Sequence, residues 1–309
     1  MKVAVIGAGR WGKNHIREYL SLGQEVTVCD LNAEILEQRR KEFPNISTEA
    51  SLEKILVDDS IRALSICTPN ETHVSIAEKF LNAGKNILLE KPMALNSKDA
   101  KKLAELAKQK KSVFTVGHVF RYNNALIEAK KWLDEGKLGE VYIAKLTWTN
   151  LDPIYENWDI LTDLGLHPVD ILHYLFGGKP RGLQYAGECY RKKQGEEAGF
   201  VSGKIGKKTL FEIEMSWLTP KKVRTVFLVG EKQSLYIDAL AQTVEVLEKV
   251  GEEKKLSLEP SNALNWELKA FLDSVESGKP LRVTPEIGVQ VTEILEEAKH
   301  SLESWKEKK

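Results

Sequence analysis

Cysteine is scarce in this sequence. Only three cysteines occur among 309 residues, and Cys29, Cys67 and Cys189 lie too far apart to form a Cys-x-x-Cys pair. An odd number of widely spaced cysteines argues against a disulfide framework. We therefore expect the protein to work in a reducing compartment, and the cytoplasm fits best.

The sequence also lacks net charge and long hydrophobic runs. Its 45 basic side chains balance its 45 acidic ones, so no long-range field gathers nucleic acid or anionic lipid. The apolar N-terminal run ends at Gly7, whereas a membrane span needs about 20 apolar residues. We therefore expect no nucleic-acid partner, no membrane partner and no export signal.

Short apolar runs and amphipathic helical stretches alternate through the first 120 residues. The strand-like runs are residues 2–6, 25–29, 62–67, 86–89 and 112–117. Helical spacing of apolar residues covers 10–22, 33–42, 71–83 and 97–110. This alternation is typical of a doubly wound parallel sheet with helices on both faces.

The pattern changes near residue 121. A helix to about residue 136, a strand over 141–150 and a helix over 164–176 come first. Short polar links then separate strand-like runs over 182–191, 199–205, 209–217, 224–229, 234–237 and 243–247, and helices are expected over 263–277 and 285–305. The sequence predicts an α/β chain of two domains, residues 1–120 and 121–309. The second is an α+β domain on a large, mostly antiparallel open sheet.

A glycine-rich loop directly follows the first strand and opens the first helix. Its sequence matches the G-x-G-x-x-G pattern of a Rossmann fold, which binds the pyrophosphate of a dinucleotide at the helix N-terminus. The glycines permit a tight turn, close backbone approach and close packing of helix on sheet. A strand-to-helix turn in another α/β protein is the alternative. The cofactor contacts expected here are Gly7, Gly9, Arg10, Trp11 and Gly12.

Asp30 stands at the end of the second strand, eighteen residues after Gly12. A carboxylate at this place accepts hydrogen bonds from the ribose hydroxyls of NAD and repels the 2′-phosphate of NADP. The next arginine is Arg39. The sequence therefore favours NAD over NADP, unless a distant lysine or arginine reaches the site.

Four further motifs occur in order along the chain. They are Thr68-Pro69-Asn70-x-x-His73, Glu90-Lys91-Pro92, Gly117-His118-Val119-Phe120-Arg121-Tyr122-Asn123 and Asp163-x-x-x-His167-x-x-Asp170. With these motifs and the closing segment from Val283 to Gly288, the chain resembles the Gfo/Idh/MocA oxidoreductase family. The resemblance covers nearly the whole sequence.

The resemblance implies a Rossmann domain followed by a domain whose open sheet often mediates dimer or tetramer contacts, with the nicotinamide ring between them. Lys91 matches the lysine that touches the substrate hydroxyl and the cofactor, and His167 matches the acid/base histidine. Asp163 matches the aspartate between them. The residues implied to line the cofactor are Thr68, Pro69, Asn70, His73, Glu90 and Lys91.

The chemistry of these residues suits the oxidation of a secondary alcohol. A base must take the hydroxyl proton while a hydride leaves, and an imidazole such as His167 titrates near neutral pH. Lys91, kept cationic by Asp163, would stabilise alkoxide character on the oxygen. Asp170 could orient the imidazole or bind substrate.

Other interpretations of the same residues are open. A lysine before proline is often a solvated strand end, and a histidine in an apolar helix is often a buried core residue. Asp163, His167, Asp170 and His173 also have the helical spacing of metal ligands, but the family-like lysine and the lack of thiols favour no metal.

The substrate is the least constrained prediction. Many family members have a run of glycines before the aspartate, whereas residues 157–162 of this chain contain none. This departure and the segment with Arg121 and Tyr122, both expected to bind substrate, are similar to the branch that oxidises the 3-hydroxyl of UDP-N-acetylhexosamines. A free sugar, inositol or another cyclic polyol is equally admissible. Trp148, Tyr155 and Trp158 are candidates either to stack on the substrate or to pack internally. A non-catalytic NAD-binding redox sensor is the alternative of a different class.

Overall fold

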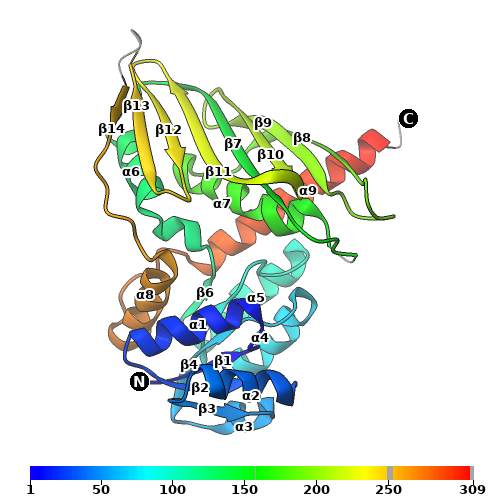
Figure 1. Ribbon diagram of the computed structural model, residues 1–309, viewed down its shortest axis with the longest axis vertical. Coiled ribbons are helices and arrows are strands. Elements are labelled where there is room, and N and C mark those ends of the chain that lie inside the picture. The colour runs from blue at the N-terminus through cyan, green and yellow to red at the C-terminus, as the bar shows by residue number, and fades with distance from the viewer. Residues whose placement is uncertain (157, 249–252, 307–309) are drawn as a thin grey trace. The chain divides into compact units, whose positions relative to one another are not determined.

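The computed structural model describes residues 1–156, 158–248 and 253–306 (Figure 1). The chain divides into two compact units. The first comprises residues 1–119 and 264–292, and the second comprises residues 120–263 and the chain from residue 293 onward. Residues 264–292 thus follow the second sheet in the sequence but group with the first unit.

The first unit is built on a six-stranded parallel sheet. Its strand order is β3 (Ile46–Glu49), β2 (Glu25–Cys29), β1 (Lys2–Ile6), β4 (Ile61–Ile66), β5 (Asn86–Leu89) and β6 (Phe114–Val116). The order reverses between β1 and β4, where the carboxyl ends of parallel strands form a ligand-binding crevice. The predicted doubly wound parallel sheet is confirmed.

Helices follow the strands of this sheet. They are α1 (Arg10–Ser21), α2 (Ala33–Glu42), α3 (Leu52–Val57), α4 (His73–Asn82) and α5 (Ser97–Lys110), joined by α8 (Ala263–Ser277) and the first turns of α9 (Pro285–Lys306). The central strands are apolar on both faces, and Val3, Ala4 and Val5 are fully buried. Asn32 and Asn96 cap α2 and α5 by accepting hydrogen bonds from backbone N–H groups.

Helix α1 has one buried face that the spacing of its residues explains. Gly12, His15, Ile16 and Tyr19 follow the i, i+3, i+4, i+7 pattern and are all buried. Two of these residues, His15 and Tyr19, are polar and sit inside the domain. The glycine loop is therefore tied to the interior by polar groups as well as by apolar packing.

The second unit is built on an eight-stranded sheet. Its order is β14 (Glu253–Lys255), β13 (Thr243–Leu247), β12 (Ser234–Asp238), β11 (Leu218–Gly230), β7 (Val141–Leu151), β10 (Thr209–Ser216), β9 (Ala198–Ile205) and β8 (Arg181–Glu188). Strands β7 and β10 pair in parallel and the other neighbours are antiparallel. The predicted mostly antiparallel sheet is confirmed.

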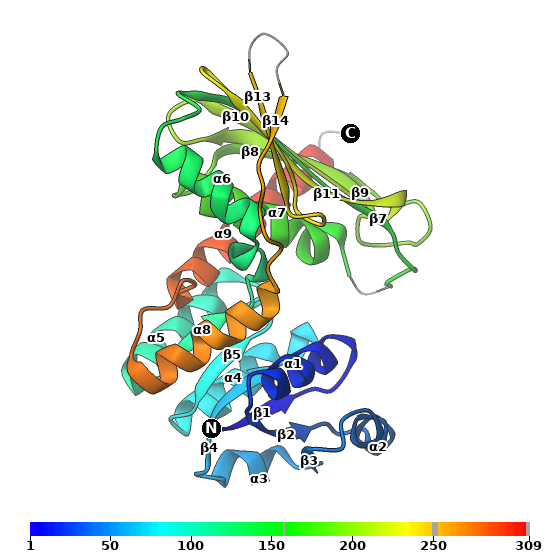
Figure 2. The same cartoon turned by 60° about the vertical axis from the view of Figure 1, so that its left-hand side comes forward.

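Helices cover one face of this sheet, and no helix of the described residues covers the other face (Figures 1 and 2). The covering helices are α6 (Asn124–Asp134), α7 (Leu166–Phe176) and the later turns of α9. The backbone N–H of Tyr185 on β8 donates to the hydroxyl of Ser301 on α9 at 2.9 Å. Side chains on the covered face, such as Trp148 and Ile213, are fully buried.

Several elements differ from the sequence prediction. Strand β3 and helix α3 were not predicted, because their residues are short runs that are only partly buried. Strand β11 begins at Leu218, earlier than expected. A π-helical turn, η3 (Leu161–Gly165), precedes α7 and extends the predicted helix toward the N-terminus.

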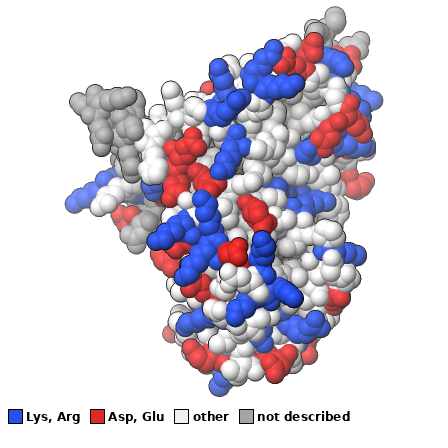
Figure 3. Space-filling view, turned by 180° about the vertical axis from the view of Figure 1, so that it is seen from behind, with Lys and Arg blue, Asp and Glu red and all other residues white. Residues whose placement is uncertain are grey.

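The charges at the surface match the balanced composition (Figure 3). Basic and acidic side chains are interspersed over the face shown in Figure 3. Among the described residues, no helix has the length and apolar character needed to cross a membrane.

Candidate active site

The glycine loop has the shape that a dinucleotide requires. Gly7 has φ +88°, and a Cβ there would lie 2.7 Å from the carbonyl oxygen of Cys67. A Cβ on Gly12 would lie 1.9 Å from the carbonyl oxygen of Gly7. By contrast, no atom lies within 4 Å of a Cβ built on Gly9. The first and third glycines are thus required by packing, while the second leaves open space beside the start of α1.

Free backbone N–H groups and the side chains of Arg10 and Trp11 lie on the exposed side of this loop. Gly9 is the N-cap of α1 and no side chain caps it, so the first turn keeps N–H groups available for an anion. Arg10 is exposed and the Trp11 side chain is 39% exposed. The residues present therefore fit a pyrophosphate.

Asp30 is bound to the backbone beside the glycine loop. Its carboxylate accepts hydrogen bonds from the N–H of Ala8 at 2.7 Å and from the N–H of Asn32 at 2.9 Å. Arg39 donates from Nε to the carbonyl of Ala8 at 2.9 Å and is 6% exposed. Glu42 binds the same guanidinium at 2.6 Å. The arginine nearest to Asp30 in the sequence is therefore buried and paired.

The Thr68-Pro69-Asn70 segment follows β4 and leads into the 3₁₀ turn η1 (Asn70–Thr72). The hydroxyl of Thr72 donates to the carbonyl of Pro69 at 2.7 Å and lies 2.7 Å from the hydroxyl of Thr68. His73 is fully buried, with Nε2 2.9 Å from the carbonyl oxygen of Thr68. This segment is thus fixed at the carboxyl end of β4.

Glu90 and Lys91 follow β5 and differ in exposure. Glu90 is 6% exposed, and His15 Nε2 lies 2.8 Å from its Oε1 atom. Lys91 is half-buried. A Cβ on Gly117 would lie 2.9 Å from the Glu90 carboxylate, so glycine leaves the room that this side chain occupies. Sequence reasoning missed His15, although its place in the buried stripe of α1 indicates an interior role.

Burial and hydrogen bonding shift two pKa values at these strand ends. Burial alone would raise the pKa of Glu90, but His15, the indole N–H of Trp11 and the charge of Lys91 outweigh it and hold that pKa below its ordinary value. Burial lowers the pKa of His73 despite the carbonyls of Pro92 and Thr68. Glu90 is therefore ionised at neutral pH, and His73 is neutral.

Asp163 and His167 belong to the second unit. Asp163 lies in the π turn η3 and His167 in the first turn of α7, so the segment is helical as predicted, although its first turn is wider than an α-turn. Both side chains are half-buried, whereas residues 164–166 and 168–172 are buried. The His167 ring packs edge-on against Phe120, with centroids 5.1 Å apart. These two polar side chains thus stand at partly accessible positions of an otherwise buried run.

Two packing features position the π turn. The Asp159 carboxylate accepts a hydrogen bond from the N–H of Thr162 at 2.7 Å, and Lys299 binds the same carboxylate at 2.9 Å. Burial raises the pKa of Asp159, but the Lys299 charge and the hydrogen bonds outweigh it and lower that pKa. A Cβ on Gly165 would lie 2.4 Å from Sδ of Met215 on β10. The turn therefore needs glycine at residue 165 to reach the sheet.

Arg224 on β11 is a buried cation near Asp163. It donates to the carbonyl of Thr149 at 2.8 Å and to the side chain of Asn150 at 2.5 Å. Burial lowers the pKa of Arg224 to about 10, and the negative charges of Asp152 and Asp163 partly offset this effect. The second unit thus provides its own positive charge beside Asp163.

Arg121 is held inside the second unit. Its Nε donates to Oδ1 of Asp170 at 2.8 Å, and its Nη2 lies 2.9 Å from Nδ1 of His173. Its guanidinium also stacks over Tyr174, 5.3 Å from the ring centroid. Tyr122 is 4% exposed and its carbonyl accepts a hydrogen bond from the hydroxyl of Ser261 at 2.9 Å. Both residues expected to bind substrate are therefore buried.

The same contacts bear on the alternative metal site. Asp170 and His173 are both bound to the Arg121 guanidinium, which leaves little space for a cation between them. Within the described ranges, no group of three or more histidine, cysteine or carboxylate side chains is arranged to hold a metal ion.

The three candidate aromatic residues differ in environment. Trp148 is fully buried, and Phe120 packs edge-on against it with centroids 5.3 Å apart, so it is a core residue and cannot stack on a substrate. Tyr155 and Trp158 are half-buried and stack on each other with centroids 6.0 Å apart. Only these two remain as candidates for sugar or base stacking.

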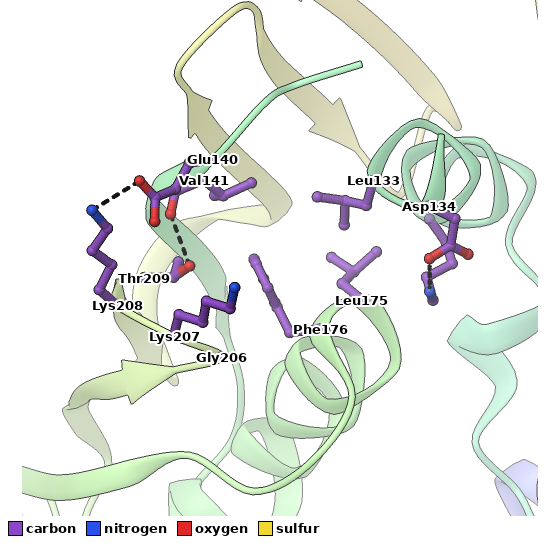
Figure 4. Close-up of a pocket in the computed structure, with 11 residues that line it drawn as sticks. Leu133, Asp134, Glu140, Val141, Leu175, Phe176, Gly206, Lys207, Lys208 and Thr209 are labelled. Carbon is purple, nitrogen blue, oxygen red and sulfur yellow. Dashed lines mark hydrogen bonds and ion pairs between the residues drawn. The ribbon is translucent and has the colours of Figure 1, made fainter. Parts of the chain in front are cut away.

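A pocket of about 300 Å³ lies elsewhere in the second unit, between α6, the end of α7 and the β9–β10 turn (Figure 4). Leu133, Val141, Leu175 and Phe176 form its apolar side. Its described lining includes no predicted site residue, so the pocket is separate from the candidate site.

Comparison with known proteins places the chain in a family. Residues 1–118 match the model of the oxidoreductase family with an NAD-binding Rossmann fold, and residues 126–236 match the Gfo/Idh/MocA C-terminal domain. This chain belongs to the Gfo/Idh/MocA oxidoreductase family. The resemblance drawn from the sequence motifs is confirmed.

Curated members of the Gfo/Idh/MocA family match over nearly the whole chain. UDP-N-acetylglucosamine 3-dehydrogenase of Acidithiobacillus ferrooxidans is 24% identical over 297 residues, which cover 91% of this chain and 90% of that protein. The NAD⁺-dependent scyllo-inositol 2-dehydrogenase of Bacillus subtilis is 26% identical, with 94% and 93% of the two chains covered.

Solved structures of this family share the fold. The structure of the A. ferrooxidans enzyme superposes with a TM-score of 0.89 at 22% identity over 98% of both chains. Levoglucosan dehydrogenase, solved with NADH and levoglucosan, superposes with a TM-score of 0.89 at 18% identity, over 98% of this chain and 97% of that one.

Proposed function

We propose that this protein is an NAD-dependent dehydrogenase that oxidises a secondary ring hydroxyl of a sugar or nucleotide sugar by hydride transfer. The proposal depends on two features of the first unit. A glycine loop with open space at Gly9 and the half-buried Lys91 stand at the carboxyl ends of strands of the same sheet. Ligands of such sheets bind at this edge.

NAD is the cofactor that these residues favour. Asp30 puts a carboxylate beside the glycine loop, where it repels a 2′-phosphate, and Arg39 is occupied by Ala8 and Glu42. The residues proposed to line the cofactor are Gly7, Gly9, Arg10, Trp11, Gly12, Asp30, Thr68, Pro69, Asn70, His73, Glu90 and Lys91. Of these, His73 and Glu90 are so buried that they would act by shaping the site from behind.

The proposed chemistry divides between three side chains. NAD, when bound, supplies the hydride acceptor. Lys91 binds the hydroxyl oxygen and stabilises negative charge that develops on it. His167 accepts the hydroxyl proton, and the Asp163 carboxylate favours the cationic form of the lysine.

The names of the relatives guide the substrate proposal. The enzyme from A. ferrooxidans is a UDP-N-acetylglucosamine 3-dehydrogenase and matches this chain nearly end to end. We infer a UDP-N-acetylhexosamine as the first substrate to test. Tyr155 and Trp158 present partly exposed rings for it, and buried Arg121 and Tyr122 would support the wall of its site. A cyclic polyol is the second substrate class, because the B. subtilis relative oxidises scyllo-inositol.

We further propose a cytoplasmic homodimer or homotetramer that pairs through the helix-free face of the second sheet. Ile143 and Leu210, which are paired in register, are 44% and 52% exposed. Phe200 and Tyr236 lie on the same face and are 51% and 39% exposed. Large apolar side chains exposed on one sheet face, here beside the Lys145–Glu212 ion pair, are typical of an interface between subunits.

The first experiment is a substrate panel with purified protein. NAD⁺ is offered with UDP-N-acetylhexosamines, free sugars and cyclic polyols while absorbance of the reduced nicotinamide is followed. Reduction with one class identifies the substrate. Binding of NAD⁺ without reduction by any member of the panel would contradict the dehydrogenase proposal and favour the sensor.

A further inference from the structure

We propose that two buried histidines, His15 and His73, clamp the chain on either side of Lys91 and act as positioning residues. This inference rests on the proposed function in so far as Lys91 binds the reacting hydroxyl. His15 holds Glu90, the residue before the lysine, and His73 lies against Pro92, the residue after it. Both histidines are fully buried, so neither can reach a substrate.

The first half of the clamp is a chain of hydrogen bonds that begins inside α1. The hydroxyl of Tyr19 lies 2.8 Å from the hydroxyl of Ser65, which lies 3.0 Å from Nδ1 of His15. Nε2 of His15 lies 2.8 Å from the Glu90 carboxylate. A carboxylate only accepts, so Nε2 bears the proton. In a neutral His15 every group then donates in one direction, from Tyr19 through Ser65 and His15 to Glu90.

Glu90 passes this constraint to Lys91. The Lys91 backbone N–H donates to Oε2 of Glu90 at 3.2 Å, and the Trp11 ring packs edge-on against His15 with centroids 6.4 Å apart. Trp11 is part of the glycine loop. His15 and the Glu90 carboxylate therefore link the loop proposed to hold the cofactor to the backbone of the lysine proposed to hold the hydroxyl.

The second half of the clamp comes from α4. Nδ1 of His73 lies 2.8 Å from the carbonyl oxygen of Pro92, and Nε2 lies 2.9 Å from that of Thr68. A neutral imidazole has one N–H, so His73 donates to only one of the two carbonyls at a time. His73 thus lies between the segment after β4 and the segment after β5 and binds one of them by a hydrogen bond.

These contacts leave Lys91 between two anchored neighbours. A lysine side chain has about four rotatable bonds and loses much conformational entropy when it is held in one rotamer. If its backbone is already fixed, less entropy is lost when its ammonium group binds the reacting oxygen. A site can keep all its catalytic residues and still lose activity when weak supporting contacts let those residues move by about 1 Å. The clamp therefore affects turnover more than cofactor affinity.

The test uses the full-length protein and measures how fast the Lys91 amine is acetylated. Brief labelling with acetic anhydride, followed by peptide mass spectrometry, gives the modification rate of each lysine. Lys85 is the internal reference, because it is buried and its ammonium binds the carbonyls of Asp58 and Ile61. In His15→Leu and His73→Phe, the ratio of Lys91 to Lys85 labelling should rise at least three-fold. In His15→Gln, which keeps an N–H donor, it should rise less.

Tyr185→Phe is the matched control. It removes one buried hydroxyl on β8 of the second unit and belongs to neither half of the clamp, so the labelling ratio should stay at the wild-type value. If His15→Leu does not fold, Glu90→Gln replaces it, because this variant changes the partner of His15 in the same contact. One variant is read for each half of the clamp: His73→Phe for the second half, and either His15→Leu or Glu90→Gln, whichever folds, for the first. A labelling ratio that is unchanged in both variants would overturn the proposal.

Turnover separates this inference from the proposed function. With an active substrate, kcat of His15→Leu and His73→Phe should fall about ten-fold or more, while the Kd of NAD⁺ stays within about three-fold. If the labelling ratio rises and kcat is unchanged, the clamp stands and the proposed role of Lys91 fails. If none of the substrates in the panel allows the wild-type protein to reduce NAD⁺, the proposed function fails. The labelling ratio alone then decides whether the clamp exists.

Discussion

His15 Nε2 lies 2.8 Å from Oε1 of Glu90 in the interior of the first unit, where both side chains are buried. The pair joins the helix that begins at the glycine loop to the strand end that precedes Lys91. A buried ion or hydrogen-bonded pair of this kind contributes little net stability compared with an apolar pair, but removing one partner is costly. The buried His15–Glu90 pair is therefore better explained by its effect on the position of Lys91 than by a contribution to stability.

The pH dependence of stability tests the state of Glu90. Its pKa in the folded protein lies below its ordinary value, so its contribution to stability is complete above pH 5 and is lost as the pH falls through the folded pKa. Glu90→Gln should lower the free energy of unfolding by about 1–3 kcal/mol at pH 7. Urea unfolding at several pH values should show this difference shrinking below about pH 4.

Comparison with Glu90→Gln at each pH also removes most of the contribution of His73, because burial and two backbone carbonyls affect the pKa of His73 more than the charge of Glu90 does. The pKa of His73 is lowered in the folded protein, so both proteins lose stability as the pH falls below about 6.5, where the unfolded state binds the proton first. A difference between wild type and Glu90→Gln that stayed constant down to pH 3 would show that Glu90 is not a carboxylate in the folded state.

Asp30 tests the choice of cofactor. Asp30→Ala removes the carboxylate beside the glycine loop together with its hydrogen bond to the N–H of Ala8. We expect the Kd of NAD⁺ to rise about ten-fold and the Kd of NADP⁺ to change less, because repulsion of the 2′-phosphate is lost. Calorimetric titration with both cofactors measures the ratio. A preference for NAD⁺ equal to that of the wild type would rule out the ribose assignment.

Gly165 tests the packing of the π turn that holds Asp163. An added Cβ would lie 2.4 Å from Sδ of Met215, so Gly165→Ala should destabilise the protein by about 1–3 kcal/mol. Met215→Ala removes the clashing atom, so the double variant should be more stable than the sum of the two single changes predicts. Thermal or urea unfolding of the four proteins gives the coupling energy. Simple additivity would mean that the two residues do not meet.

His167 tests the assignment of the base. His167→Gln removes a proton acceptor from a half-buried position and should reduce kcat by about 100-fold or more. His173→Gln is the control, since this residue is buried on the same helix and is bound to Arg121. Steady-state rates, corrected for the folded fraction, should fall much less for the control. Equal rates for wild type and His167→Gln would remove the histidine from the mechanism.

The two sheets could be predicted because their strands alternate with helices or turns in regular ways. Asp163 and His167 could be placed on one helical segment from their spacing, but the π turn depends on how Gly165 meets β10, which no local pattern shows. Strand β3 is half-buried and has no clear apolar period. The grouping of residues 264–292 with the first unit is a long-range contact that local sequence does not encode.

The side chains behind the site were harder to predict than those facing it. His15 lies three residues after the glycine motif on α1, and its partner Glu90 is 75 positions away in the sequence. From the sequence, Trp148 could either stack on a substrate or pack internally, and its burial on the covered face of β7 makes it a core residue. In both cases the tertiary partner decides the role.

Turnover of Lys91→Ala, compared with the wild type and with NAD⁺ affinity measured on the same samples, tests whether the lysine acts in hydride transfer. We expect kcat to fall about 100-fold or more while the Kd of NAD⁺ changes by no more than a few-fold, since the lysine acts on charge that develops during the transfer. Turnover of the variant at the wild-type rate would contradict this role of Lys91.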